Sequence, residues 1–213
     1  MTTKTSCKDG ETIETAFSRS LAALGLDYVD LYLIHHPFWA KSPVDQSAKW
    51  AEMEAIKESG RARSIGVSNY LQEHLEPILS TAEFPPVVNQ IEYHPYLQHG
   101  DLVAWHKEKG IALEAYAPLT AITKVPGGPV DTVYDRLAAK YGVSAGDVAL
   151  RWCLDQDIVV LTTSASEKRL QGYLKTLLSF NLTPEEIEQI SIAGKGKHYR
   201  GFWKHRIAED DHR

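Results

Sequence analysis

The stretch YVDLYLIHHP, from Tyr28 to Pro37, decides the fold class of this chain. Side chains alternate along a strand, and here the residues on both faces of the run are mostly apolar. Strands that are apolar on both faces are typical of parallel sheets covered by helices. His35 ends the run and Pro37 stops it. A polar side chain at the carboxyl end of such a strand lies where α/β folds place their chemistry, so His35 is the first candidate site residue.

Length and composition predict one globular domain over residues 1–213, with residues 194–213 as a C-terminal loop or tail. Of the 213 residues, 43% are hydrophobic and 24% are charged, as in ordinary soluble proteins. The net charge of −5 and the lack of a basic stripe disfavour nucleic acid as a partner. No apolar run is long enough to span a membrane, and no signal peptide is recognisable. We therefore expect a cytoplasmic protein.

The cysteines and histidines predict neither a disulfide framework nor a metal site. Cys7 and Cys153 lie far apart and have no CxxC spacing, so we expect two reduced thiols. The histidines are scattered and show no HExxH or similar ligand spacing, which disfavours a metal-dependent hydrolase.

Strand-like runs alternate with amphipathic stretches along nearly the whole chain. Strands are expected at residues 1–4, 28–35, 63–68, 87–92, 111–117 and 158–163. Helices are expected at residues 11–24, 47–58, 73–82, 101–109, 130–141, 145–155 and 167–177. Thr183-Pro184-Glu185-Glu186 is a helix start, with a capping threonine and a proline at the first helical position, and it predicts one added helix.

Alternating strands and helices predict a parallel sheet with right-handed crossovers. A doubly wound sheet and a (β/α)8 barrel both satisfy this pattern. The dinucleotide fingerprint GxGxxG is absent, which weighs against a Rossmann domain. A complete barrel has eight units and typically about 250 residues. The prediction is an α/β, (β/α)8 TIM barrel, N-terminally truncated to about six βα units, with a C-terminal extra helix and tail.

Polar residues cluster at the carboxyl ends of these strands. They are His35, Ser68, Asn69, Gln90, Tyr116 and Ser164, with Arg169 entering the following helix. An isolated serine or asparagine after a strand is more often a cap or a turn residue. Five successive strand ends that all supply hydrogen-bonding side chains favour a small-molecule site at the rim of a barrel.

Five motifs in this chain, in this order, resemble those of the aldo-keto reductases, and of fungal-type members most of all. They are LDYVDLYLIHHP, SIGVSNY, VVNQIEYHP, LEAYAPL and SASEKR. The resemblance runs from Met1 to about Arg200. It implies a barrel oxidoreductase that uses a nicotinamide cofactor to reduce an aldehyde or a ketone by hydride transfer.

The resemblance also implies roles for individual residues. His35 is similar to the active-site histidine that orients the substrate carbonyl, and Lys4 is similar to the lysine that lowers the pKa of the acid tyrosine. The residues similar to those that hold the nicotinamide carboxamide are Ser68, Asn69 and Gln90. His36 and Trp39 are similar in position to residues that line the substrate pocket, although a loop surface explains them equally well.

The remaining cofactor positions lie in the second half of the chain. Tyr116 is similar to the aromatic residue that stacks on the nicotinamide, and Leu119 in the same motif is expected to contact the cofactor. Ser164 and Arg169 are similar to residues that bind the adenosine 2′-phosphate, which favours NADPH. Thr163 stands where the family usually has a lysine, and this departure weakens the preference for NADPH.

A second departure concerns the acid. In the family, the catalytic tyrosine and the aspartate paired with the lysine belong to the first two barrel units, and no tyrosine here has a matching position. We therefore expect weak or no turnover from this chain alone. The alternative is a non-catalytic, reductase-like protein that binds a nucleotide or a partner. A complete barrel would be a monomer, whereas unpaired strand edges predict self-association of the truncated one.

Overall fold

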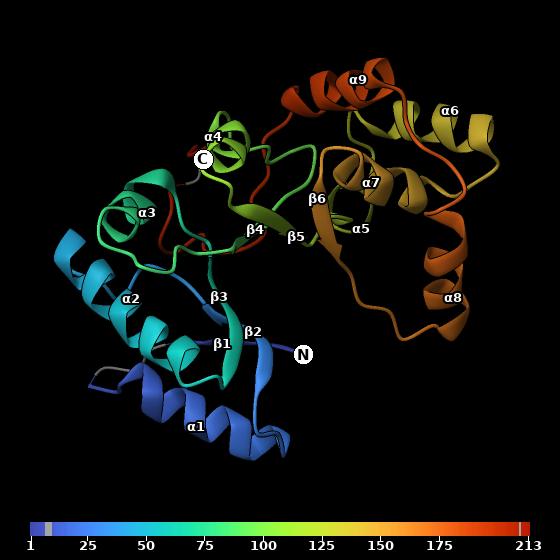
Figure 1. Ribbon diagram of the computed structural model, residues 1–213. Coiled ribbons are helices and arrows are strands. Elements are labelled where there is room, and N and C mark those ends of the chain that lie inside the picture. The colour runs from blue at the N-terminus through green and yellow to red at the C-terminus, as the bar shows by residue number, and fades with distance from the viewer. Residues whose placement is uncertain (7–9, 209) are drawn as a thin grey trace. The chain divides into compact units, whose positions relative to one another are not determined.

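Strands and helices alternate along the chain in the computed structural model, as the sequence predicts (Figure 1). The structure describes residues 1–6, 10–208 and 210–213. These residues form two compact units, one of residues 1–91 with 104–112 and one of residues 92–103 with 113–213. Two compact units can belong to one domain, so the single domain expected over residues 1–213 stays a prediction. Each unit is described below by itself.

The first unit is built on strands that pair in parallel and in chain order. They are β1 (Thr2–Thr5), β2 (Val29–Ile34), β3 (Ala62–Ser68) and β4 (Val88–Glu92). The register sets Lys4 opposite Leu33, and Ser68 opposite Gln90. Parallel pairing places the carboxyl ends of all these strands at one edge, which is the edge that carries the predicted site.

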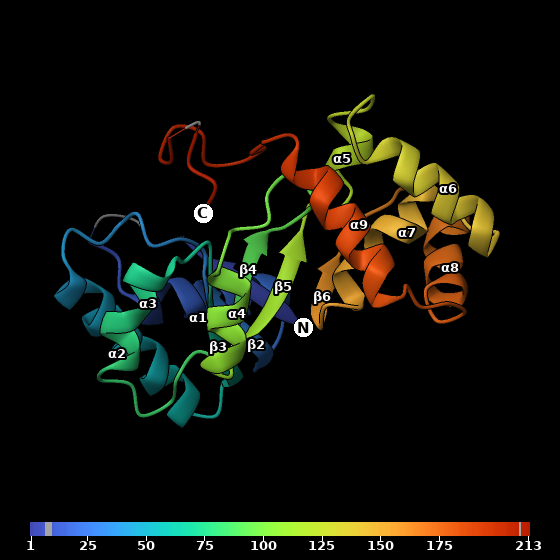
Figure 2. The same cartoon turned by 90° about the horizontal axis from the view of Figure 1, so that it is seen from above.

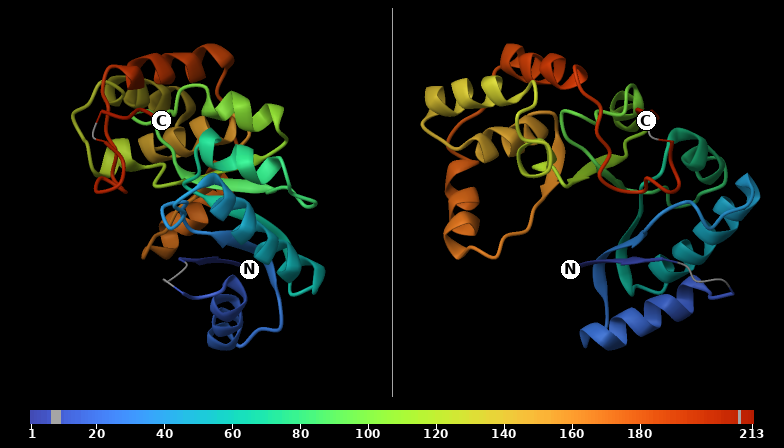
Figure 3. Two further views of the ribbon diagram at one scale, coloured as in Figure 1. Left: turned by 90° about the vertical axis from the view of Figure 1, so that its left-hand side faces the viewer. Right: turned by 180° about the vertical axis from the view of Figure 1, so that it is seen from behind.

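Helices cover one face of these strands, where α1 and α2 lie side by side (Figures 1 and 3). The helices are α1 (Ile13–Leu24), α2 (Pro43–Glu58) and α3 (Gln72–Leu79), and α4 (Leu102–Glu108) follows β4. Phe17 of α1, Tyr32 of β2 and Trp50 of α2 are fully or almost fully buried and belong to one hydrophobic core. Burial of this core is the main force that fixes the strands.

The predicted start of α2 was wrong by four residues, because the helix begins at Pro43 and not at residue 47. Ser42 caps the helix by accepting a hydrogen bond from the Asp45 peptide N–H at 3.4 Å. The Asp45 carboxylate accepts in return from the Ser42 peptide N–H at 2.8 Å. This reciprocal capping box, with proline at the first helical position, stabilises a first turn that has no apolar periodicity.

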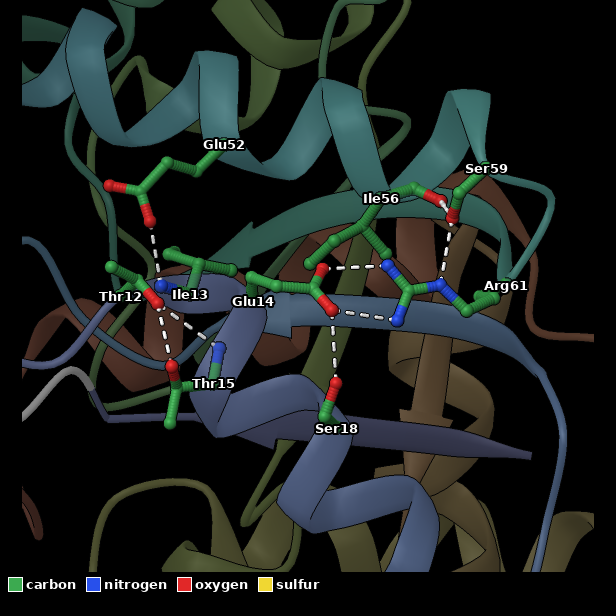
Figure 4. Close-up of polar contacts among 9 residues, drawn as sticks. All are labelled: Thr12, Ile13, Glu14, Thr15, Ser18, Glu52, Ile56, Ser59 and Arg61. Atoms are coloured by element: carbon green, nitrogen blue, oxygen red, sulfur yellow. Dashed lines mark hydrogen bonds and ion pairs between the residues drawn. The ribbon is translucent and has the colours of Figure 1, made fainter.

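Polar contacts at the beginning of α1 tie this helix to α2 and to the loop before β3 (Figure 4). Thr12 caps α1 by accepting from the Thr15 peptide N–H at 3.1 Å. The Ile13 peptide N–H donates to the Glu52 carboxylate of α2 at 2.7 Å. Arg61 donates to both oxygens of Glu14, at 2.8 and 2.6 Å. Two-pronged pairing of this kind fixes orientation, so α1 is held in a defined position on the sheet.

The second unit contains two parallel strands with helices around them (Figure 2). The strands are β5 (Ala112–Tyr116) and β6 (Ile158–Leu161), and β6 ends two residues before its predicted end. The helices are α5 (Thr120–Thr123), α6 (Asp131–Tyr141), α7 (Ala145–Leu154), α8 (Glu167–Thr176) and α9 (Pro184–Lys195). The sequence did not predict α5, which is a single short turn.

The predicted starts of α7, α8 and α9 are confirmed, and α6 begins one residue after its predicted start. Ser144 and Asp147 form a capping box at α7, and Thr183 and Glu186 form one at α9. The helix α9 runs to Lys195, two residues into the predicted tail, and the described residues beyond it form neither helix nor strand. Cys153 is a buried free thiol whose pKa is raised by burial, whereas Cys7 lies outside the described residues. None of the described helices combines the length and the apolar character needed to cross a membrane.

Candidate active site

The carboxyl ends of the first unit's strands bring predicted site residues together. The Lys4 ammonium of β1 donates a hydrogen bond to the side-chain oxygen of Gln90 on β4. Two strands separate β1 from β4, and in a flat sheet three strand spacings amount to about 14 Å. Side chains that stand perpendicular to a flat sheet would not meet across this distance, so the contact indicates a curved sheet whose side chains converge on one face.

His35 lies next to this pair, just beyond the end of β2. Its peptide N–H donates to the Thr5 carbonyl at 2.8 Å and extends the pairing of β1 with β2. Its Nδ1 lies 2.9 Å from the Ser6 hydroxyl. Burial, reinforced by the positive charge of Lys4 and by His36, lowers the pKa of His35 to about 4. The imidazole is therefore neutral at pH 7, and in this form one of its ring nitrogens is an N–H donor.

The amide and hydroxyl residues at the ends of β3 and β4 are bonded to one another. Asn69 has a left-handed backbone with a φ of 62°, and its side-chain amide donates to the His35 carbonyl at 2.9 Å and to the Ser68 hydroxyl at 3.0 Å. The Ser68 hydroxyl donates to the Gln90 carbonyl at 2.7 Å. These residues thus perform the turn chemistry expected after strands and also assemble amide groups beside His35 and Lys4.

The two predicted pocket residues differ in their surroundings. The ring of His36 is tilted against that of His35, with centroids 5.9 Å apart, and is stacked on Phe38 at 5.6 Å. Trp39 is partly buried and packs against the hydrophobic core of the first unit. The structure places His36 beside the candidate active site and gives Trp39 a packing role.

Tyr116 and Leu119 belong to the second unit. Tyr116 ends β5, and its ring meets that of Phe202 edge to face with centroids 5.3 Å apart. Burial raises the pKa of Tyr116, and the negative charge of Glu92 raises it further. Leu119 precedes α5, and its carbonyl accepts from the Thr123 peptide N–H at 2.9 Å. Tyr116 is thus a neutral aromatic surface rather than an acid.

Ser164 and Arg169 lie together at the start of α8. The guanidinium Nε of Arg169 donates to the Ser164 hydroxyl at 3.0 Å, and this hydroxyl also accepts from the Ser166 peptide N–H at 3.0 Å. Ser166 caps α8 by accepting from the peptide N–H of Arg169. The Arg169 side chain is exposed. An exposed arginine at a helix N-terminus is a favourable environment for a phosphate group.

The sequence did not predict two groups of residues near these positions. Ser6, the partner of His35, follows β1 but was not recognised as a strand-end residue. Glu92 of β4 is buried with His94 and His99 in the second unit. A charged residue inside a buried strand, in the motif QIEYH, is the signal that could have identified this second group. Across the described ranges, no three His, Cys, Asp or Glu side chains form a group able to hold a metal ion.

Comparison with protein families matches residues 2–195 to the Aldo/keto reductase family. The chain is similar to the NAD/NADP-dependent indole-3-acetaldehyde reductase of Schizosaccharomyces pombe, with 36% identity over 200 residues, or 92% of this chain and 69% of that protein. It is also similar to the NADPH-dependent alpha-keto amide reductase of Saccharomyces cerevisiae, with 38% identity over 82% of this chain and 58% of that protein. The glyoxal reductase of Bacillus subtilis is 38% identical over 87% of this chain and 64% of its own length.

Solved structures give the same result. An aldo/keto reductase from Brucella melitensis superposes with a TM-score of 0.79 and 33% identity, over 90% of this chain and 72% of that one. An aldo-keto reductase of Bombyx mori, in complex with NADP, superposes with a TM-score of 0.81 and 34% identity, over 90% of this chain and 66% of that one. The predicted α/β fold class is confirmed by these likenesses. The chain spans 58% to 69% of the length of the three reductases named above.

Proposed function

Because this chain belongs to the aldo/keto reductase family, we propose that it serves the NADPH-dependent reduction of an aldehyde or a ketone to an alcohol. The observation that carries the proposal is the convergence of Lys4, His35 and Gln90 at the carboxyl ends of parallel strands. The proposed substrate is a small carbonyl compound, in line with the small-molecule reductases that the chain resembles.

The residues present suit a nicotinamide cofactor. A carboxamide has both N–H donors and a carbonyl acceptor, and the side chains of Asn69 and Gln90 have the same two kinds of group, with the Ser68 hydroxyl beside them. Arg169 and Ser164 at the start of α8 suit a phosphate, which supports NADPH over NADH. Bound NADPH would supply the hydride. The protein contributes orientation and electrostatics.

His35 acts as a neutral hydrogen-bond donor to the substrate carbonyl in this proposal. A pKa of about 4 leaves very little imidazolium at pH 7, so His35 orients and polarises the carbonyl rather than protonating it. Lys4 is held beside Gln90, and its positive charge favours the developing negative charge on the carbonyl oxygen.

We propose that the chain by itself turns over slowly. The resemblance assigns the acid to a tyrosine, and no tyrosine of this sequence has a matching position. Tyr116 is a poor substitute because burial raises its pKa. A positioned acid typically contributes about 10² to 10⁴-fold in rate, so a loss of this order is expected.

The alternative function is that of a reductase-like protein which binds the nucleotide or a partner without catalysis. The raised pKa of Tyr116 and the low pKa of His35 favour it, because they leave neither group suited to give up a proton at pH 7. The two functions differ in turnover and share nucleotide binding. The proposed compartment in either case is the cytoplasm.

The test measures NADPH binding by fluorescence titration and NADPH oxidation with an aromatic aldehyde. The first function predicts saturable binding and slow turnover that His35→Gln lowers further. Binding without turnover supports the alternative. Gln90→Leu should weaken binding at least ten-fold, whereas Gln72→Leu, at an exposed position of α3, should leave it unchanged. Absence of NADPH binding, or turnover equal to that of a complete family member, contradicts the proposal.

A further inference from the structure

We propose that Glu92 is a positioning residue whose buried carboxylate fastens residues 200–203 onto Tyr116 and so fixes the Tyr116 ring at the end of β5. All of these residues belong to the second unit. The attachment of residues 200–203 is supported by contacts within this unit. Its effect on the cofactor rests on the proposed function, together with the family resemblance that makes Tyr116 similar to the residue stacking on the nicotinamide.

The Glu92 carboxylate binds the tail through two consecutive peptide groups. One oxygen accepts from the Gly201 N–H at 2.7 Å, and the other accepts from the Phe202 N–H at 3.1 Å. His94 Nε2 lies 3.1 Å from the first of these oxygens. Glu92 is 2% exposed and His94 is fully buried, so the carboxylate itself is shielded from water. Hydrogen bonds to an ionised acceptor are about twice as strong as neutral ones.

Because the Glu92 carboxylate is charged, detaching the tail from it has a large free-energy cost. Burial alone would raise the pKa of Glu92, but the hydrogen bonds from His94, Gly201 and Phe202 outweigh it and leave the pKa below its usual value. The group is therefore ionised at pH 7. A buried carboxylate that loses its donors is strongly unfavourable, so departure of the tail is opposed.

Gly201 is suited to this contact because it has no side chain. A Cβ atom at this position would lie 2.9 Å from the Glu92 oxygen that accepts the Gly201 N–H, closer than real Cβ contacts allow. Any larger residue would push the tail away from the carboxylate. The absence of a side chain at Gly201 thus suits the Glu92 carboxylate, although the two residues lie 109 positions apart in the sequence.

The fastened segment makes two contacts with Tyr116. The Phe202 ring meets the Tyr116 ring edge to face, with centroids 5.3 Å apart and an interplanar angle of 87°. The Trp203 side chain hydrogen-bonds to Tyr116 and lowers its pKa, against the larger effect of burial. Trp203 has a left-handed backbone, and its carbonyl accepts from the Arg206 and Ile207 peptide N–H groups at 2.8 and 3.0 Å. This turn presents both aromatic side chains to Tyr116, so loosening the tail removes both supports of the ring.

Limited trypsin digestion tests the attachment without cofactor. Cleavage after Lys204, which follows the fastened segment, is compared with cleavage after Lys175 at the exposed end of α8. We expect Glu92→Ala to raise the rate after Lys204 at least ten-fold and to leave the rate after Lys175 unchanged. Glu92→Gln keeps an oxygen acceptor and should restore part of the protection. Glu188→Gln, on the exposed side of α9, is the matched control with no effect.

A second measurement tests the role of the attachment at the site. NADPH titration should show at least three-fold weaker binding for Glu92→Ala, with intermediate binding for Glu92→Gln. Gly201→Ala should likewise speed cleavage after Lys204 and weaken NADPH binding. It replaces Glu92→Ala in both measurements if that variant does not fold. Unchanged cleavage after Lys204 in Gly201→Ala and Glu92→Gln overturns the attachment, and faster cleavage with unchanged NADPH affinity overturns the positioning role. If the unaltered chain binds no NADPH, the proposed function fails while the trypsin result still decides the attachment.

Discussion

Like His35, His99 has a lowered pKa, and the contacts of His99 show the cause more completely. His99 Nε2 lies 2.6 Å from the Glu92 carbonyl, so the neutral ring donates its proton there. Its buried Nδ1 has no hydrogen-bond partner within the described part of the chain. Protonation would place an unpaired N–H donor and a charge in the interior, and burial accordingly lowers the pKa of His99 to about 4.

This environment predicts how stability depends on pH. The unfolded chain binds a proton at His99 near pH 6.5, whereas the folded chain binds it only near pH 4. Between these values the unfolded state binds more protons, so the free energy of unfolding falls as the pH drops from 6.5 to 4. We expect the melting temperature to fall across this range and the fall to be shallower in His99→Gln. Thermal melts at half-unit pH steps measure both slopes.

The control for this prediction is a surface histidine. His205 is exposed in the tail, and His205→Gln should leave the pH dependence of the melting temperature unchanged. Equal slopes for His99→Gln and the unaltered chain would show that His99 does not titrate in this way.

Residues at the ends of strands could be predicted from the sequence, and residues that act through distant contacts could not. His35, Ser68 and Asn69 interrupt apolar runs, so alternation alone marks them. The role of Glu92 depends on a tail 109 residues away, and no local pattern encodes that meeting. The chemical roles of Lys4 and Gln90 came only from family resemblance and stay predictions, although the structure places the two side chains in contact.

At the scale of elements, the sequence predicted where helices and strands exist better than where they begin. The first turn of α2 was missed because Val44 in that turn is 74% exposed and contributes no apolar periodicity. Its start is set by the Ser42–Asp45 capping box, a polar signal that a search for amphipathic spacing ignores. The short α5 was missed because four residues are too few to show helical periodicity.

The surroundings of Gly66 show that the strands of the first unit pack closely. A Cβ atom at Gly66 in β3 would lie 2.6 Å from the Val88 carbonyl oxygen and 2.9 Å from a Leu33 methyl carbon. Both neighbours belong to adjacent strands, and the Val88 carbonyl is backbone that cannot shift without moving β4. Gly66→Ala should therefore lower the free energy of unfolding by about 1–3 kcal/mol, as overpacking typically does. Urea unfolding followed by circular dichroism measures the change.

The matched control is Gly172→Ala in α8. A Cβ atom there meets nothing within 4 Å, and alanine is the better helix former by about 1 kcal/mol, so this change should stabilise slightly. The same substitution would thus have opposite signs at two positions. Equal effects at both would argue against close packing of β3.

At the scale of the whole molecule, the alternation of strands and helices was enough to predict the fold class. Parallel strands require crossover helices, so the order of elements along the chain already limits the architecture. The boundary between the two compact units was not predicted, because no linker composition marks the sequence near residues 91–92. That division follows from contacts, which local patterns do not report.

The second unit exposes apolar side chains on β6 and on or next to α8, which together are its exposed apolar surface. They are Val159 and Leu161 of β6, Leu170 and Leu174 of α8, and Leu178 just after α8. No residue of α8 is buried, and among the described residues β5 is the strand that pairs with β6. An unpaired strand edge and exposed leucines each favour pairing with another chain. Self-association through this surface, with a second copy as the partner, is the proposal that follows.

Substitutions of two leucines, one on α8 and one just after it, test this proposal. Leu174 and Leu178 are 76% and 85% exposed, so replacing both by glutamate costs the folded monomer little but places like charges within any interface between copies. We expect the unaltered chain to increase in mass with concentration, and the double variant Leu174→Glu, Leu178→Glu to stay monomeric, in sedimentation measurements. Val44→Glu, at an exposed apolar position of α2, should associate like the unaltered chain. A monodisperse monomer at all concentrations, or association that the α8 variant leaves unchanged, would show that this surface does not join two copies.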